Sequence, residues 1–154
     1  MKKLLTLFCG CILLFSGCSK EPNESKDQPG LSIPEMEQQV IELVNRKRSD
    51  AGLDALQREE SLMASCNIRA EELVTRFSHT RPDGSPWDTA ITTTNITRGE
   101  NIAFGQSSAE DVMNAWMNSQ GHRENILNVN YTHIGVGCYK HNGILYWVQL
   151  FIGR

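Results

Sequence analysis

The spacing of apolar residues predicts three helices in the first two thirds of the chain. Residues 34–50 carry large apolar side chains at every third or fourth position, with a proline in the first turn, as an amphipathic helix does. The same spacing predicts a second helix over residues 58–76. Ser107 and Ser108 each precede an acid by three residues, so they are candidate caps of a third helix that ends near Gly121.

The C-terminal quarter of the chain changes to the two-residue period of strands. Residues 132–139 and 144–152 are strand-like, and an Asn-Gly pair between them favours a tight hairpin. In the first strand, Gly135 and Gly137 leave one face open to close packing. The second strand is apolar on both faces, which predicts a central strand in a covered sheet. The predicted fold class is therefore α+β, with helices on both sides of a small antiparallel sheet.

A long polar segment separates the second and third predicted helices. Residues 77–98 are rich in Pro, Gly, Asp and Thr and show no period, so we expect an irregular loop. Loops of this length inside compact domains often carry function.

The first residues have the order of a secretory signal. Two lysines precede a mostly apolar run, and small residues stand directly before Cys18. This arrangement resembles a bacterial lipobox, which implies cleavage before Cys18 and attachment of fatty acyl chains, such as palmitate, to that residue. Secretion without a lipid is the alternative. The expected location is the bacterial cell envelope, at a membrane or the cell surface.

Three regions follow from these features: a signal peptide at 1–17, a lipidated flexible tether at 18–33 and a single folded domain at 34–154. The whole chain has 15 basic and 18 acidic residues, a formal charge of −3. Loss of the signal removes two lysines, so the mature protein is more acidic. An acidic domain without a basic stripe argues against nucleic acid as a partner. The expected partners are the membrane, through Cys18, and a ligand or protein.

Two cysteines, Cys66 and Cys138, fall in the predicted domain. A disulfide is one alternative in an oxidising compartment, and two separate core residues are the other. The sequence leaves both open, because pairing depends on how far apart the two Cα atoms lie.

The candidate chemistry lies in three polar motifs. His79 follows Phe77-Ser78, Glu100 lies in Gly99-Glu100-Asn101, and His122 is the second residue of a Gly-His-Arg-Glu-Asn motif. Histidine is a common metal ligand and carries protons near neutral pH. Two histidines brought together by folding, with a carboxylate nearby, therefore form the best candidate site.

Together with Trp116 and the Ile134–Gly137 segment, these motifs resemble the CAP superfamily in composition and order. The resemblance is to its bacterial, cysteine-poor branch. The SCP domain of this family also occurs in cysteine-rich secretory proteins, insect venom antigens and plant pathogenesis-related proteins. It covers residues from about 36 to 152 and implies an α-β-α sandwich.

The resemblance also implies a solvent-facing cleft lined by two histidines and two glutamates. His79 and His122 match the histidines that can hold a divalent metal, often zinc, and Glu100 matches one glutamate. Ser119 stands where the family has the second glutamate. With Glu100 and Ser119 beside the metal ligands His79 and His122, we expect any Zn²⁺ or other divalent cation to be bound weakly, because zinc sites normally have three or four protein ligands.

Three functions compete. A lipid-anchored binding module is favoured, since the site has few side chains that could ligate a metal and no nucleophile is evident. A metal-dependent hydrolase of peptide or cell-wall material would use His79, His122 and Glu100. A structural or interaction domain would use them only to pin the long loop onto the third helix. A Ser119–His122 hydrolase lacks a nucleophile-turn motif. Trp116 and Trp87 are expected to anchor the core beneath the cleft.

Overall fold

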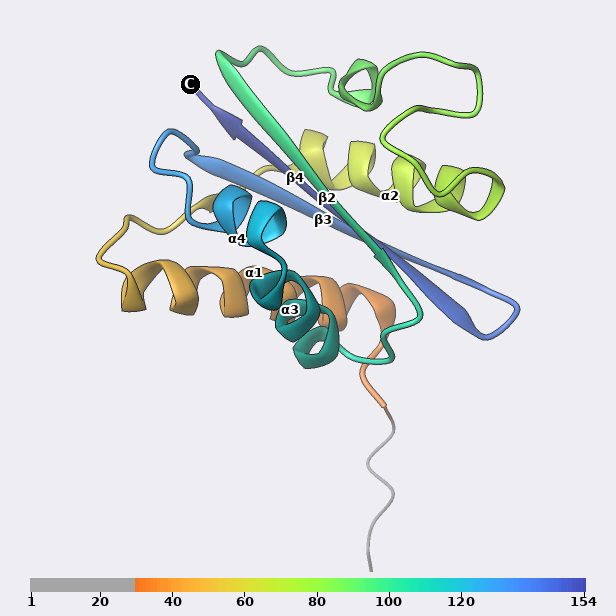
Figure 1. Cartoon of the computed structure of the whole chain (residues 1–154), viewed down its shortest axis with the longest axis horizontal. Coiled ribbons are helices and arrows are strands. Elements are labelled where there is room, and N and C mark those ends of the chain that lie inside the picture. The colour runs from red at the N-terminus through yellow and green to blue at the C-terminus, as the bar shows by residue number, and fades with distance from the viewer. Residues whose placement is uncertain (1–29) are drawn as a thin grey trace, which may run out of the picture.

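The computed structural model describes residues 30–154, which form an α-β-α sandwich (Figure 1). The predicted signal peptide, Cys18 and most of the tether lie outside these residues. In chain order, the elements are α1 (Ile33–Asp50), β1 (Gln57–Arg58), α2 (Glu60–Thr75), the 3₁₀ turn η1 (Trp87–Ala90), β2 (Thr97–Phe104), α3 (Ala109–Asn118), α4 (Gln120–Ile126), β3 (His133–His141) and β4 (Ile144–Gly153).

The sheet has the strand order β1-β3-β4-β2, so β4 lies between β3 and β2 as the apolar pattern predicts. β4 pairs antiparallel with both neighbours over nearly its full length. The sheet is mixed rather than purely antiparallel, because the two-residue β1 adds to β3 in parallel. The predicted fold class is confirmed, with this short parallel strand as the addition.

The β3–β4 hairpin turns on Asn142 and Gly143, as predicted. Both residues have positive φ, 49° for Asn142 and 81° for Gly143. A two-residue turn with positive φ at both positions matches the right-handed twist of the flanking strands, and Asn-Gly meets that requirement at low cost.

Helix α2 packs directly on the backbone of β3. A Cβ placed on Gly135 would lie only 2.5 Å from the backbone carbon of Leu62, and one on Gly137 would overlap Cys66. Because both glycines lack side chains, the helix approaches the sheet closely and buries Leu62 and Cys66 fully. The predicted open face of this strand is therefore confirmed.

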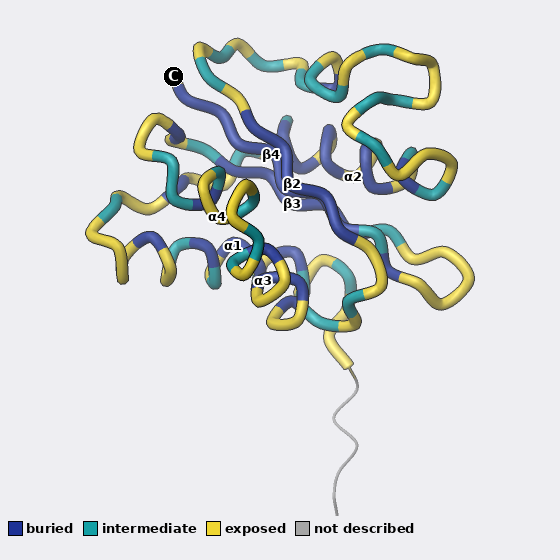
Figure 2. Tube along the Cα trace, in the orientation of Figure 1, coloured by how far each residue is buried: buried dark blue, intermediate teal, exposed yellow. Residues whose placement is uncertain are grey.

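Helices α1 and α3 cover the other face of the sheet (Figure 1). The buried residues of Figure 2 accordingly form two clusters, one on each side. Cys138 belongs to the α1 side and Cys66 to the α2 side, and both thiols are free. The disulfide alternative is therefore excluded in this structure, since the sheet lies between the two side chains.

The structure corrects two boundaries near the candidate site. The predicted third helix ends at Asn118, because Ser119 has an extended backbone (φ −99°, ψ 123°), and the unpredicted helix α4 follows at once. The irregular loop ends at Ile96, because β2 begins at Thr97 and contains the Gly-Glu-Asn motif. Sequence periodicity missed β2 because its polar Glu100 and Asn101 are both buried.

Candidate functional site

The site lies at β2, the edge strand of the sheet. Alternate residues of β2 face opposite layers, so Glu100 points toward α2 and Asn101 toward α3 and α4. The loop that carries His79 lies on the first side, and the α3–α4 junction that carries His122 lies on the second. The three motifs, far apart in sequence, thus meet along one strand.

Glu100 is the centre of a buried ion network. Its side chain is 1% exposed, and its Oε1 accepts a hydrogen bond of 2.8 Å from Nε of Arg69, a fully buried residue of α2. Its Oε2 lies 2.7 Å from Nδ1 of His79. A buried carboxylate is tolerated only when it is paired and hydrogen-bonded, and here both oxygens have partners.

Arg69 also holds the loop on α2. Its guanidinium donates to Glu72 Oε2 at 2.8 Å and to the backbone oxygen of Ser78 at 2.9 Å. Glu72 in turn accepts from Arg81 at 2.6 Å. Arginine suits this role because its planar fork donates several hydrogen bonds in fixed directions. Residues on both sides of His79 are therefore fixed to the helix.

His79 combines a fixed ring with an exposed edge. Its side chain is 55% exposed although Nδ1 contacts a buried carboxylate. We assign the Nδ1 proton to the hydrogen bond with Glu100, since the carboxylate of this ion network accepts. Among residues 30–154, no group hydrogen-bonds to Nε2 of His79, so that nitrogen is free to contact a ligand.

On the other side of β2, where His122 lies, the site is held by amide side chains rather than by ions. Asn101 Nδ2 donates to the backbone oxygen of His122 at 3.1 Å and to Gln149 Oε1 at 3.0 Å. Asn125 Nδ2 donates to Asn101 Oδ1 at 2.9 Å and to the backbone oxygen of Glu100 at 3.2 Å. This network joins β2, β4 and α4 and places the backbone of His122.

Gly99 lets the side chains of Tyr131 and Asn125 lie close to the backbone of β2. A Cβ at Gly99 would overlap the hydroxyl of Tyr131 and lie 3.0 Å from Asn125 Oδ1. The Gly-Glu-Asn motif thus has three separate roles. Gly99 permits close approach, Glu100 anchors one histidine, and Asn101 positions the other.

His122 is half-buried at the start of α4. Burial lowers the pKa of His122, because the charged imidazolium loses hydration, and the nearby His79 lowers it further. The electrostatic effect of His79 on this pKa means that the two rings lie within interaction range of each other. Two imidazoles, one of them favoured in its neutral form, are available there to a metal or a polar ligand.

Ser119, the position of the missing glutamate, is the joint between α3 and α4. It is partly exposed, and among residues 30–154 its hydroxyl makes no hydrogen bond with His122. Within the same part of the chain, no group of three or more His, Cys, Asp or Glu side chains is arranged to hold a metal. The physical reason is that Ser119 supplies no carboxylate and both oxygens of Glu100 are engaged.

Two essential residues of the site were missed by the sequence analysis, Arg69 and Gln149. Each is a polar residue inside an apolar pattern: Arg69 shares the buried face of α2 with Cys66 and Leu73, and Gln149 interrupts the apolar run of β4. A polar residue at a core position was the available signal, because such groups are buried only with partners. The core prediction for Trp116 is confirmed, whereas Trp87 is only partly buried.

The fold and the site define an α-β-α sandwich domain in which two histidines lie on either side of β2. Comparison with known proteins assigns this domain to a family. Residues 41–151 match the family model described as "CAP: Cysteine-rich secretory protein family". That match covers most of the chain. The chain belongs to this family, and the resemblance seen in the sequence motifs is confirmed.

Among curated proteins, the chain is similar to YkwD of Bacillus subtilis (strain 168), with 42% identity over 141 residues, 88% of this chain and 54% of YkwD. The chain thus spans about half the length of this relative. Among solved structures it resembles an extracellular protein with an SCP domain from Bacillus anthracis str. Ames. The TM-score is 0.70 and the identity 28%, over 80% of this chain and 44% of that one.

The fold alone is shared with an outer surface protein from Borrelia burgdorferi. The TM-score is 0.73 and the identity 24%, over 80% of this chain and 96% of that chain. Extracellular and surface proteins are thus among the structural relatives. Between residues 30 and 154, no helix has the length and apolarity needed to span a bilayer.

Proposed function

We propose that this protein is a lipid-anchored binding module of the cell envelope, with a cleft that presents His79 and His122 to a ligand. A divalent cation such as Zn²⁺ is the ligand that a pair of imidazoles fits best. With two protein ligands and the rest water, such a cation would be held weakly. The extracellular and surface relatives support the location of the proposed module.

One observation carries the proposal. Glu100 contacts Nδ1 of His79 at 2.7 Å while the ring remains more than half exposed. In metal sites a carboxylate commonly accepts the second ring N–H of a ligating histidine, which fixes the tautomer and aims the other nitrogen at the metal. Arg69 in turn fixes Glu100 from inside the protein.

Zinc titration calorimetry on the purified full-length protein in mild detergent tests the proposal. We expect heat of binding for the wild type and none for the His79→Ala, His122→Ala double variant. The matched control is His133→Ala with His141→Ala, which removes the two histidines outside the site and should leave the heat unchanged. Equal heats from the two double variants would exclude zinc binding by His79 and His122.

Hydrolysis is the second candidate, because a carboxylate oriented on a histidine can also make that histidine a general base. Binding is preferred, since Glu100 has both oxygens engaged and Ser119 forms no dyad with His122 among residues 30–154. Glu100→Gln should abolish any activity found on peptide or muropeptide libraries. Its melting temperature should be followed in parallel, because a large decrease would indicate that the network serves stability instead.

The lipid anchor has its own test. Replacement of the proposed lipidation site, Cys18→Ser, should move the protein from the membrane fraction to the soluble fraction of the expressing cells. The mass of the purified wild type should include the acyl chains. Unchanged fractionation of the variant would rule out anchoring through this residue.

A further inference from the structure

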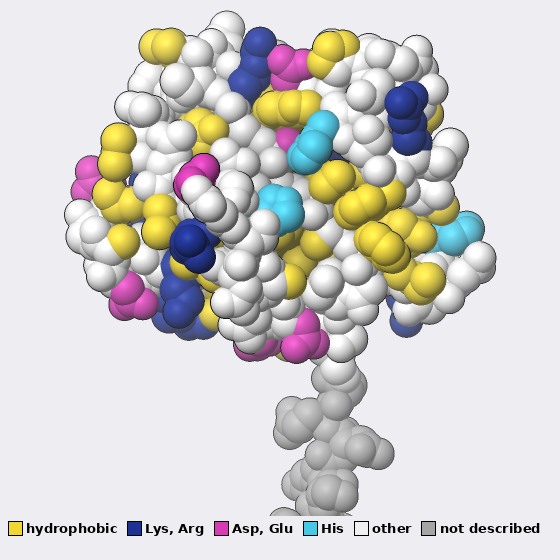
Figure 3. Space-filling model, viewed as in Figure 1, with side chains coloured by type: hydrophobic (Ala, Val, Ile, Leu, Met, Phe, Trp, Pro, Cys, Tyr) yellow, Lys and Arg dark blue, Asp and Glu magenta, His cyan; other side chains and the backbone are white. Residues whose placement is uncertain are grey.

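Exposed hydrophobic side chains gather at the end of the sheet where the β3–β4 hairpin turns. Phe77, Phe104 and Ile144 are exposed large hydrophobic residues there, and we call them, together with Tyr146, the hairpin-end surface. It lies on the α2 side of the sheet, where Tyr146 packs against the buried cluster of Leu62 and Val148. Figure 3 shows hydrophobic side chains collected beside histidines on the face viewed there. A concentration of this kind on a soluble domain marks a contact surface.

Aromatic rings form the centre of the hairpin-end surface. The ring centroids of Phe77 and Phe104 are 4.7 Å apart, and those of Phe104 and Tyr146 are 6.0 Å apart. Phe77 is 47% exposed and Phe104 50%, although each ring contacts another. Three segments distant in sequence therefore hold these rings together without burying them.

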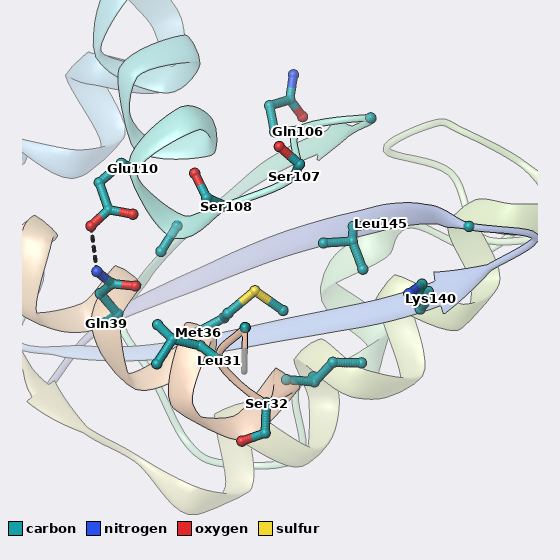
Figure 4. Close-up of a pocket in the computed structure, with 15 residues that line it drawn as sticks. Leu31, Ser32, Met36, Gln39, Gln106, Ser107, Ser108, Glu110, Lys140 and Leu145 are labelled. Carbon is teal, nitrogen blue, oxygen red and sulfur yellow. Dashed lines mark hydrogen bonds between the residues drawn. The ribbon is translucent and has the colours of Figure 1, made fainter. Parts of the chain in front are cut away.

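The start of the described chain lies at the same end. A cavity joins the segment from Gly30 to Ile33 with Gly105, after β2, and with Gly143 and Leu145 of the hairpin. Figure 4 shows Leu31 and Leu145 among the side chains of this cavity, and Glu110 hydrogen-bonded to Gln39 beside them. Any chain that precedes Gly30 thus enters the domain beside the hairpin.

This entry point decides what covers the surface. Cys18 is 12 residues before Gly30, and 12 residues span at most about 40 Å. Twelve residues that behave as a random coil span about 20 Å on average. This is less than the length of the ten-residue strand β4, which is about 33 Å. A lipid on Cys18 would therefore hold the hairpin end closer to the bilayer, on average, than the opposite end. Phenylalanine and tyrosine rings at a protein surface partition into the membrane interface, where they bury apolar area next to the headgroups.

The charges favour apolar contact over attraction to anionic lipid. Lys140 is the basic residue that lines the cavity, and Glu110 lines it as well. A surface without a cluster of lysines and arginines gains little from anionic headgroups. Insertion of the aromatic and aliphatic side chains is then the expected source of affinity.

We propose that the hairpin-end surface docks on the bilayer that carries the anchor, with Phe77, Phe104 and Tyr146 in the membrane interface. The proposal rests on the lipid anchor proposed above. Because β2 carries both Phe104 and Glu100, docking would place the histidine site next to the headgroup region. Ligands of the cleft would then be molecules at the membrane surface.

A tryptophan reporter at each end of the sheet tests this docking. Phe104→Trp keeps an aromatic ring in the hairpin-end surface. Ile96→Trp is the matched control, since Ile96 is 85% exposed beside the last residue of β4, Gly153. The full-length proteins are placed on phosphatidylethanolamine–phosphatidylglycerol vesicles with brominated acyl chains, which quench fluorescence on contact.

The extra tryptophan fluorescence of each variant is its emission minus that of the wild type. We expect the bromolipid to quench this extra fluorescence several-fold more in Phe104→Trp than in Ile96→Trp. Equal quenching at both positions, or none at residue 104, would overturn the proposal. Analytical ultracentrifugation without vesicles tests whether a second copy of the protein covers the hairpin-end surface instead. A dimer that Phe77→Ser with Phe104→Ser dissociates would also overturn membrane docking. The acyl mass of the protein reports the anchor separately, so loss of the anchor is distinguishable from failure of the surface.

Discussion

The two histidines of the candidate site are held by different kinds of network. His79 is fixed through its side chain by charged groups, Glu100 and the fully buried Arg69. His122 is placed through its backbone by neutral amides, Asn101 and, behind it, Gln149. The ring of His79 is therefore fixed in orientation, whereas His122 is fixed only at its backbone. An ion network is also the more vulnerable of the two, because an unpaired buried charge costs more than an unpaired amide.

Arg69→Met should therefore have the largest effect on stability. It removes the arginine partner of Glu100 and one partner of Glu72, so the buried carboxylate of Glu100 keeps only its contact with His79. We expect a loss of about 3–5 kcal/mol in the free energy of unfolding, measured by chemical denaturation. The control is Arg98→Met, which breaks the 2.8 Å pair with Asp88 at a half-exposed arginine. That loss should stay within about 1 kcal/mol, and similar losses for both variants would contradict the contrast.

Asn101→Leu tests the amide side. It removes the donor to the His122 backbone oxygen and to Gln149, so we expect a loss of about 2–3 kcal/mol by the same denaturation assay. Zinc heat should fall as well, since His122 loses its support. Asn95→Leu is the control, because its single hydrogen bond stays within its own loop, to Thr93. If zinc binding survives Asn101→Leu unchanged, the amides do not position His122.

Ser119→Glu adds a negative charge on the His122 side of the site. Ser119 is partly exposed at the α3–α4 joint, so a longer side chain can be accommodated. A third ligand should raise zinc affinity about tenfold, or about 1.4 kcal/mol, in titration calorimetry. Ser119→Gln has nearly the same size without the charge and should bind like the wild type. Equal affinities for the Glu and Gln variants would show that the cleft does not hold the cation there.

Much of the fold could be predicted because its signals are local. Helix α1 begins with a capping box formed by Ser32 and Glu35, and the hairpin turns on Asn142-Gly143. Strand β2 could not be predicted from periodicity. Its polar residues are buried against partners on α2, β4 and α4 that are distant in sequence.

The candidate site also has one part that could be predicted from the sequence and one that could not. The motif residues His79, Glu100 and His122 could be named from the sequence, since they carry the chemistry. Their supports could not be, because the role of Arg69 depends on a contact with Glu100 across 31 positions and that of Gln149 on a contact with Asn101 across 48. Only folding brings such pairs together. The sequence signal that points to them is a polar residue at a position where the surrounding pattern is apolar.

The smallest expected effect is the pH dependence of stability from His122. Its pKa is lowered in the folded protein, chiefly by burial, so the unfolded chain binds a proton first as the pH falls. Stability from this residue is therefore complete above its ordinary pKa near 6.5 and decreases as the pH falls below that value.

His122→Gln removes this contribution, so its unfolding free energy should depend less on pH between about pH 7 and about pH 5. The exposed His141→Gln should behave like the wild type in the same urea titrations. An unchanged slope for His122→Gln would mean that its ring is as well solvated as that of an exposed histidine, which would remove the contrast between the two sides of the cleft.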